Sequence, residues 1–107
     1  MNHHLTTLEK ITAMQISVKL GEPLWREVGA RTVQLEWPET SVTLADVVHR
    51  LRKDYSGFSA AFAGKGLNAD HPYRLFVNAR LVHLDQAKAT QLQDGDRVYV
   101  FIPVVGG

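Results

Sequence analysis

Hydrophobic and polar residues alternate in several short stretches of the chain, which is the pattern of half-buried β-strands. The first stretch, residues 14–20, places Met, Ile, Val and Leu at every second position. Residues 32–37 repeat the pattern with Val, Leu and Trp, and Pro38 ends it. The connection between the two stretches contains two glycines and a proline, so we expect a loop there, joining the strands as a hairpin.

The hydrophobic period changes between residues 43 and 55, where apolar residues recur three and four positions apart. This spacing places them on one stripe of an α-helix. Thr43 is in position to be the N-cap, and Asp46 completes a pair that resembles a capping box. The basic residues toward the end of this helix are interpreted as a solvated face. In the long connection that follows, we expect Phe58 and Phe62 to hold part of the chain to the core.

Three more strands are predicted in the second half of the chain, at residues 73–78, 80–84 and 97–103. The first two meet at Asn78-Ala79, where Asn-Gly would be the usual hairpin pair. Because alanine is strained at positive φ, we expect a turn of another type. A single helical turn is expected between the second and third of these strands.

The order strand, strand, helix, strand, strand, strand predicts an α+β fold. In such a fold the apolar stripe of the single long helix covers one face of a mixed sheet of about five strands. We expect the first and last strands to be central in the sheet and parallel to each other.

The last strand carries large apolar residues at every position from 98 to 102. If alternate residues face the helix, Tyr99 and Phe101 lie on the opposite, outer face of the sheet. The same alternation turns Phe76 outward on the third strand. Three outward aromatic side chains favour a partner-binding surface. The alternative is that the N-terminal arm or the connection after the helix folds over them.

Composition narrows the classes of function. The chain has 107 residues, 45% of them hydrophobic and 21% charged, which is ordinary for one globular domain. Its 12 basic and 11 acidic residues give a net charge of +1, which indicates neither a nucleic-acid nor a membrane partner. The absence of cysteine excludes a disulfide scaffold, a thiolate metal site and a cysteine nucleophile. No apolar run suggests a membrane span or a signal peptide, so we expect a cytoplasmic protein.

Residues 1–13 are predicted to be an N-terminal arm that precedes a domain formed by residues 14–107. The arm contains His3-His4, but two adjacent histidines are a weak ligand set, and no metal site is predicted. The other histidines are scattered over helix, loop and strand, and no acid–base pair or Ser/His/Asp set stands out. The sequence therefore does not predict an enzyme.

The stretches TLADVVHRL, LFVNARLV and LQDGDRVYVFIPVVGG resemble the ubiquitin-like β-grasp sulfur carriers. That family includes the molybdopterin synthase small subunit and the thiamine sulfur carrier. The resemblance covers residues 14–107, and its most specific element is the pair Gly106-Gly107 directly after the last strand. It implies the β-grasp version of the fold expected above.

The resemblance also implies that the carboxylate of Gly107 is the reacting group. An adenylyltransferase related to ubiquitin-activating enzymes would convert it to an acyl-adenylate with ATP, and a sulfur donor would then convert it to a thiocarboxylate. The carrier would deliver this sulfur to an acceptor enzyme such as the molybdopterin synthase large subunit. No cofactor is expected on the carrier itself, because the ATP is used by the activating partner.

The tail, residues 103–107, would enter the active site of another enzyme. Pro103 fixes φ and gives the tail a defined direction, and Gly106 keeps side chains away from the reacting carbon. Val104 and Val105 either occupy apolar subsites or simply continue the strand. Phe76, Tyr99 and Phe101 would be the anchors that dock the carrier on its partner.

The tail departs from the molybdopterin type in having Ile102 where a first proline is usual and Val105 where a small residue is usual. Pro103 still favours that type, so a sulfur carrier for molybdopterin biosynthesis is the leading hypothesis. The alternatives are a carrier for thiamine or another sulfur-containing metabolite, a ubiquitin-like modifier that forms isopeptides with lysines, and a β-grasp interaction module whose glycine pair is incidental.

Overall fold

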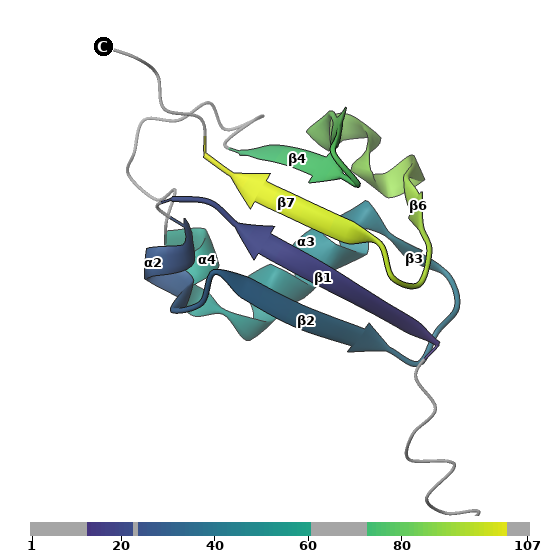
Figure 1. The fold of residues 1–107 in the computed structure, drawn as a ribbon, viewed down its shortest axis with the longest axis horizontal. Coiled ribbons are helices and arrows are strands. Elements are labelled where there is room, and N and C mark those ends of the chain that lie inside the picture. The colour runs from purple at the N-terminus through teal and green to yellow at the C-terminus, as the bar shows by residue number, and fades with distance from the viewer. Residues whose placement is uncertain (1–12, 23, 61–72, 103–107) are drawn as a thin grey trace, which may run out of the picture.

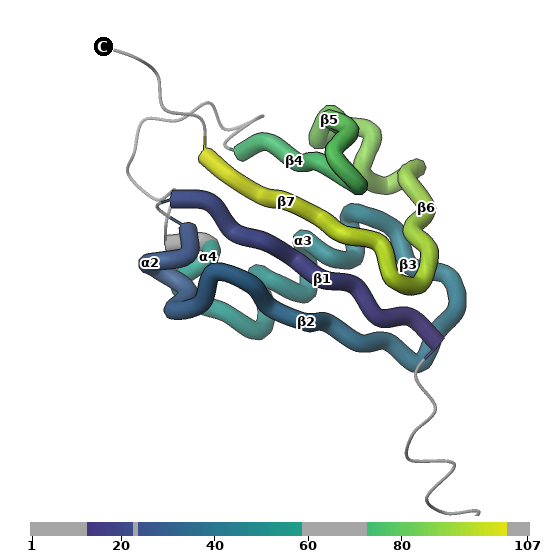
Figure 2. Tube along the Cα trace, viewed as in Figure 1, coloured from purple at the N-terminus to yellow at the C-terminus, as the bar shows by residue number. Residues whose placement is uncertain are grey.

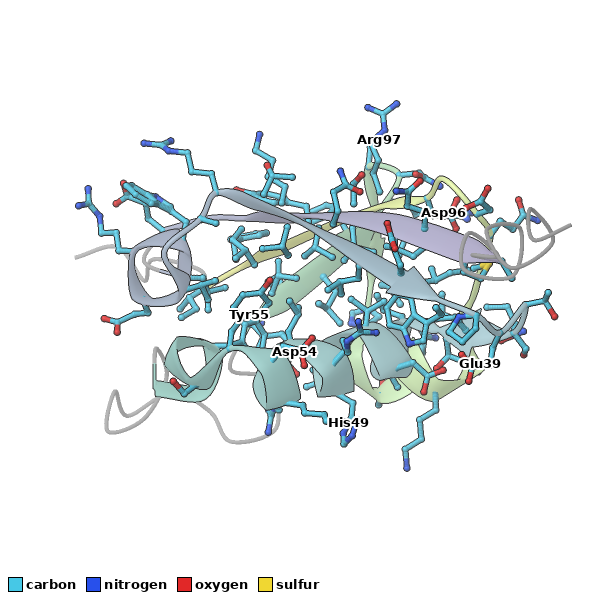
Figure 3. All side chains as sticks on the ribbon, turned by 90° about the horizontal axis from the view of Figure 1, so that it is seen from below. Glu39, His49, Asp54, Tyr55, Asp96 and Arg97 are labelled. Carbon is cyan, nitrogen blue, oxygen red and sulfur yellow. The ribbon has the colours of Figure 1, made fainter. Side chains whose placement is uncertain are left out.

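A five-stranded mixed β-sheet forms one layer of the molecule, and the long helix α3 lies across one side of it (Figure 1 and Figure 3). This computed structural model describes residues 13–22, 24–60 and 73–102. The strands have the spatial order β2-β1-β7-β4-β5. Their bounds are Met14–Leu20 for β1, Thr32–Trp37 for β2, Arg74–Val77 for β4, Arg80–Val82 for β5 and Arg97–Phe101 for β7.

The first and last strands are central and parallel, as the sequence predicts. In the register of β1 and β7, Val18 is opposite Val98. The hairpin of β1 and β2 is antiparallel, and so are the pairs β4–β7 and β4–β5. Figure 2 shows β5 beside β4, at the edge of the sheet. The predicted α+β class and ubiquitin-like β-grasp architecture are confirmed.

The helix α3 (Leu44–Asp54) has the predicted cap and buried stripe. The hydroxyl of Thr43 accepts a hydrogen bond from the Asp46 N–H at 3.2 Å, and the Asp46 carboxylate accepts one from the Thr43 N–H at 2.9 Å. These bonds satisfy two backbone donors that the first helical turn otherwise leaves without partners. The stripe consists of Leu44, Val47, Val48 and Leu51, all buried.

The core lies between this helical stripe and the inner face of the sheet. Its fully buried side chains include Ile16, Val18, Leu75, Val98 and Val100 from the strands. The short helix α4 (Ser56–Ala60) adds Phe58, which is also fully buried and whose ring centroid lies 5.9 Å from that of Tyr73. The predicted anchoring by Phe58 is confirmed, whereas Phe62 lies outside the described residues.

Several short elements were not predicted. The expected loop between the first two strands contains helix α2 (Leu24–Val28), which forms because the fully buried Leu24 holds it against the core. A second, two-stranded sheet pairs β3 (Val42–Thr43) with β6 (Gln91–Leu92). Elements of two to five residues are too short to show a hydrophobic period, so their sequences resemble loops.

The segment expected as a strand at residues 80–84 is a strand only to Val82. The 3-10 helix η1 (Leu84–Ala89) begins two residues later and is the helical turn that the sequence predicts, longer than expected. The chain between η1 and β6 lies beside the N-terminal end of α3, where the Leu44 N–H donates to the Thr90 carbonyl at 2.9 Å. None of the described helices is long and apolar enough to cross a membrane.

The turn between β4 and β5 contradicts the prediction from its sequence. Both Asn78 and Ala79 have positive φ, 49° and 72°, as the central residues of the Asn-Gly type of hairpin turn do. The expectation of another turn type was wrong because hydrogen bonds to Asn78 hold this geometry. Its N–H donates to the Arg97 carbonyl at 2.8 Å, and its amide oxygen accepts from the Arg97 N–H at 3.0 Å.

Candidate functional site

Strand β7, which precedes the C-terminal tail, lies in the middle of the sheet. It pairs with β1 on one side and with β4 on the other. Beyond the end of β1, the Gly21 N–H donates to the Val100 carbonyl at 2.8 Å, and Ile102 is buried. The direction from which the chain leaves the sheet is therefore fixed up to residue 102.

The tail itself lies outside the described residues. This applies to all five predicted tail residues, namely Pro103, Val104, Val105, Gly106 and Gly107. Their roles in direction, fit and reaction stay predictions.

The three aromatic residues predicted on the outer face of the sheet form one contiguous cluster. The ring centroid of Phe101 lies 5.2 Å from that of Tyr99 and 5.7 Å from that of Phe76, and Phe76 lies 6.2 Å from Tyr99. Ring pairs at these separations attract one another, so the three side chains hold each other in place. We call Phe76, Tyr99 and Phe101 the outer aromatic cluster.

The alternation that placed this cluster outside is confirmed. The residues expected to face the helix are all buried, namely Leu75, Val77, Val98, Val100 and Ile102. The three cluster residues are only half-buried in the described part of the chain.

Leu81 is a further residue of this surface that the sequence did not single out. It is 47% exposed, and among the described residues it is the only large hydrophobic side chain classed as exposed. In the register it pairs with Phe76, so the two side chains lie on the same face of the sheet. The sequence could have indicated this position: if Val82 faces the helix, the alternation of a strand turns its neighbour Leu81 to the outer face.

An apolar groove of about 440 Å³ runs over the outer aromatic cluster. Its lining consists of Lys19, Phe76, Ala79, Arg97, Val98, Tyr99 and Phe101. The ammonium of Lys19 lies 5.5 Å from the centroid of the Tyr99 ring, close enough for a cation–π interaction. The two basic residues of this lining are Lys19, which pairs with Tyr99 on the neighbouring strand, and Arg97, two positions before Tyr99 on β7. The groove therefore favours an apolar partner that carries negative charge at its margin.

Gly21 lies at the corner between β1 and α2, close to two residues of the outer aromatic cluster. A Cβ atom at this position would lie 2.7 Å from the Cβ of Phe101 and 3.0 Å from the Tyr99 hydroxyl oxygen. The first distance is shorter than real Cβ contacts and the second is tight, so glycine lets the corner pack against the outer aromatic cluster. The sequence analysis treated this glycine only as a loop signal.

The charges on this corner are arranged around Trp25. The guanidinium carbons of Arg31 and Arg26 lie 4.1 Å and 4.7 Å from the indole centroid. Arg26 also bonds to the carboxylate of Glu22 at 3.1 Å, and this hydrogen bond and charge lower the pKa of Glu22. The corner next to the groove thus presents two arginines and one paired carboxylate to solvent.

A second, polar hollow of about 640 Å³ lies on the helix side of the molecule, between the end of β2 and α3. Its Arg50 is held by Asp54 at 2.7 Å and by the Glu36 carbonyl at 3.1 Å, and it stacks over Trp37 at 5.1 Å. Figure 3 shows His49 on the α3 side and Arg97 on the opposite side of the sheet. The described residues contain no group of three potential metal ligands. The contacts of Arg50 hold the end of β2 against α3.

The comparison with protein families decides what kind of protein carries this surface. The model of the ThiS family matches residues 22–107, which is most of the chain. The chain belongs to the ThiS family. The match extends through β7 and the tail, so the resemblance to sulfur carriers that the sequence suggested is confirmed.

Proteins similar to this ThiS-family chain include small archaeal modifier proteins and a putative molybdopterin converting factor. Small archaeal modifier protein 3 from Haloferax volcanii is 38% identical over 69 residues, which cover 64% of this chain and 74% of that protein. The structure of SAMP1 from H. volcanii superposes with a TM-score of 0.68 at 26% identity, covering 87% of this chain and 99% of that one. A putative molybdopterin converting factor, subunit 1, from Pyrococcus furiosus gives 0.65 at 28% identity, covering 85% and 99%.

These findings establish the general class of the ThiS-family chain. It is a ubiquitin-like β-grasp protein of the sulfur-carrier and modifier type, a small carrier component that is not itself an enzyme.

Proposed function

We propose that this protein is a sulfur carrier whose reacting group is the carboxylate of Gly107. The observation that carries the proposal is the composition of β7. This one strand presents two of the three outer aromatic cluster residues and leads directly into the Gly-Gly tail. A partner that docks on Tyr99 and Phe101 receives the tail within a limited range, because Gly107 is six positions after Phe101 and six residues span at most about 20–22 Å.

The chemistry needs no side chain of the carrier. In the first step, a carboxylate oxygen of Gly107 attacks the α-phosphorus of ATP, and pyrophosphate leaves. In the second step, a hydrosulfide equivalent attacks the carbonyl carbon of the acyl-adenylate, and AMP leaves with the oxygen that was activated. The product is a thiocarboxylate, and no electrons are gained or lost. The activating partner would be an adenylyltransferase of the ubiquitin-activating type, and ATP would be its substrate.

The outer aromatic cluster would supply the binding energy for docking. Aromatic side chains in apolar grooves are typical anchors of protein interfaces. The basic margin formed by Lys19 and Arg97 would favour partners with acidic groups around an apolar patch. The corner residues Arg26 and Arg31 extend this positive margin toward α2.

For the acceptor, we favour the large subunit of molybdopterin synthase. Two features support this choice: Pro103 in the tail, and the similarity to a putative molybdopterin converting factor subunit. Delivery of sulfur to the thiamine pathway or to another metabolite uses the same first two steps and is the alternative within this chemistry.

A second function, conjugation to lysines, is favoured by a separate observation. The chain is 38% identical to small archaeal modifier protein 3 over 69 residues. The acyl-adenylate that precedes the thiocarboxylate is also the activated form from which a lysine amine can form an isopeptide bond. The two functions therefore share the first step and differ in the nucleophile.

Intact mass spectrometry tests the proposal. The protein is incubated with its organism's ubiquitin-activating-type adenylyltransferase, ATP and sulfide, and exchange of oxygen for sulfur adds about 16 Da. A variant that lacks Gly106-Gly107 is the control and should show no gain. Absence of the gain in the unaltered protein, or full function of the truncated variant in cells, would refute the proposal.

The same assay separates the acceptors. Adding the molybdopterin synthase large subunit with its sulfur-free substrate should reverse the mass gain, and adding the enzyme that builds the thiamine thiazole should not. Cellular proteins whose lysines carry this chain through an isopeptide bond to Gly107 would instead favour the modifier function.

A further inference from the structure

Ala79 occupies a backbone conformation that alanine rarely adopts. Its φ is 72°, and the only other described non-glycine residue at positive φ is its neighbour Asn78. Asparagine tolerates this left-handed region because its short polar side chain makes local hydrogen bonds. The Cβ of alanine crowds the following carbonyl oxygen in this region, and alanine has no polar side chain to compensate. The strain in this hairpin turn therefore lies at position 79.

The turn cannot release this strain by moving, because Asn78 ties it to the start of β7. Besides its two bonds with the backbone of Arg97, the Asn78 amide donates to the Asp96 carboxylate at 3.0 Å. Asp96 is itself fixed, since its carboxylate accepts from the Gln93 N–H at 2.7 Å. None of these bonds uses the side chain of residue 79. Glycine at this position would keep all of them without strain, so the alanine methyl does not serve the turn.

The position of Ala79 on the outer face suggests what the methyl does serve. Ala79 lines the apolar groove over the outer aromatic cluster. Together with Asn78 and Arg97 it also lines a smaller hollow of about 280 Å³ beside the turn. Residues Ala79 and Arg97 thus line both hollows. A glycine at position 79 would remove one methyl group from this part of the surface.

We infer that Ala79 is a specificity-determining residue of the docking surface, whose methyl closes one end of the groove against an apolar side chain of the partner. This inference rests on the proposed function. The partner segment it fits has an apolar side chain for the groove and a carboxylate beside it, because the charged residues of the lining, Lys19 and Arg97, are both basic. Strained residues that persist in a fold are typical of ligand-binding sites.

The test is the substitution Ala79→Gly, for which stability and binding should change in opposite directions. Relief of the strain should raise the Tm by roughly 3–6 °C, because glycine adopts positive φ without a steric cost. Loss of one methyl contact should weaken binding to the adenylyltransferase about fourfold. Thr32→Ala is the matched control. Thr32 pairs with Lys19 on the same face but lies outside the groove, so its truncation should leave the affinity unchanged.

The affinities are measured by isothermal titration calorimetry with the adenylyltransferase used for the mass assay, and the Tm by circular dichroism. A rise in Tm with unchanged affinity would overturn the inference, since the methyl would then contribute nothing to docking. A fall in Tm would overturn it as well, since the turn would not be strained. Mass gain and binding by the unaltered protein keep these outcomes distinct from a failure of the proposed function, in which neither is seen.

Discussion

Two adjacent residues of β7 allow the docking surface to be separated from the core by experiment. Val100 is fully buried between the sheet and the helix, and Phe101 is half-buried in the outer aromatic cluster. We predict that Val100→Ala lowers the free energy of unfolding and leaves partner affinity unchanged. We predict that Phe101→Ala lowers the free energy of unfolding less than Val100→Ala does, but strongly weakens binding to the partner.

The magnitudes follow from what each truncation removes. Val100→Ala removes two methyl groups, which is about 1.6 kcal/mol of transfer free energy, and leaves a small cavity. We therefore expect the free energy of unfolding to fall by about 2–3 kcal/mol. Phe101→Ala removes two ring contacts, at 5.2 and 5.7 Å, each of which contributes about 0.5–1.5 kcal/mol. Because water fills the space that the ring leaves on an open face, we expect the free energy of unfolding of Phe101→Ala to fall by only about 1–2 kcal/mol. Its binding free energy should fall by about 2 kcal/mol or more, which is roughly 30-fold in Kd.

Urea unfolding followed by tryptophan fluorescence gives the free energies, and titration calorimetry with the adenylyltransferase gives the affinities. Both variants should remain folded, since domains of this size have about 5–15 kcal/mol of stability. If Phe101→Ala unfolds the domain, the cluster belongs to the core. If it binds the partner as tightly as the unaltered protein does, the outer face is not the docking surface.

Two further predictions concern the core and the helix cap. Burial raises the pKa of Tyr73, so the unfolded chain ionises first as the pH rises above about 10, and stability should then fall with pH. Tyr73→Phe should make the unfolding free energy, measured by urea titration between pH 8 and 11, less dependent on pH; an unchanged slope would contradict the assignment. Thr43→Ala removes one half of the capping box and should cost about 0.5–2 kcal/mol in the same assay, whereas Thr43→Ser should cost little.

The sequence predicted those parts of the fold in which one physical signal repeats over several residues. Strand β1 alternates over seven residues and α3 keeps its stripe over eleven, so their bounds and buried faces could be inferred without the structure. The same alternation located the outer aromatic cluster, because a strand has only two faces. The parallel pairing of β1 and β7 was expected from the element order, but only the structure establishes it.

What the sequence could not predict depends on contacts between distant segments. The strands β3 and β6 have two residues each and exist because the chain brings them together. Gly21 acts through its closeness to Phe101, 80 positions along the chain, and no local pattern reports such a contact. The turn at Asn78 was mispredicted because a local preference of Ala79 was weighed without the bonds from Asp96 and Arg97 that override it.

The structure of β7 also constrains how the docking surface can change. Side chains alternate along a strand, so Tyr99 and Phe101 cannot leave the outer face unless Val98 and Val100 leave the core. The same ladder fixes where the tail begins, since β1 and β4 pair with β7 up to residues 100 and 101. The proposed docking residues of β7 and the point from which the chain continues into the tail therefore depend on one register. The proposed partner specificity can change through substitutions of groove side chains that keep this register, and Ala79, in a turn outside the ladder, is one of these positions.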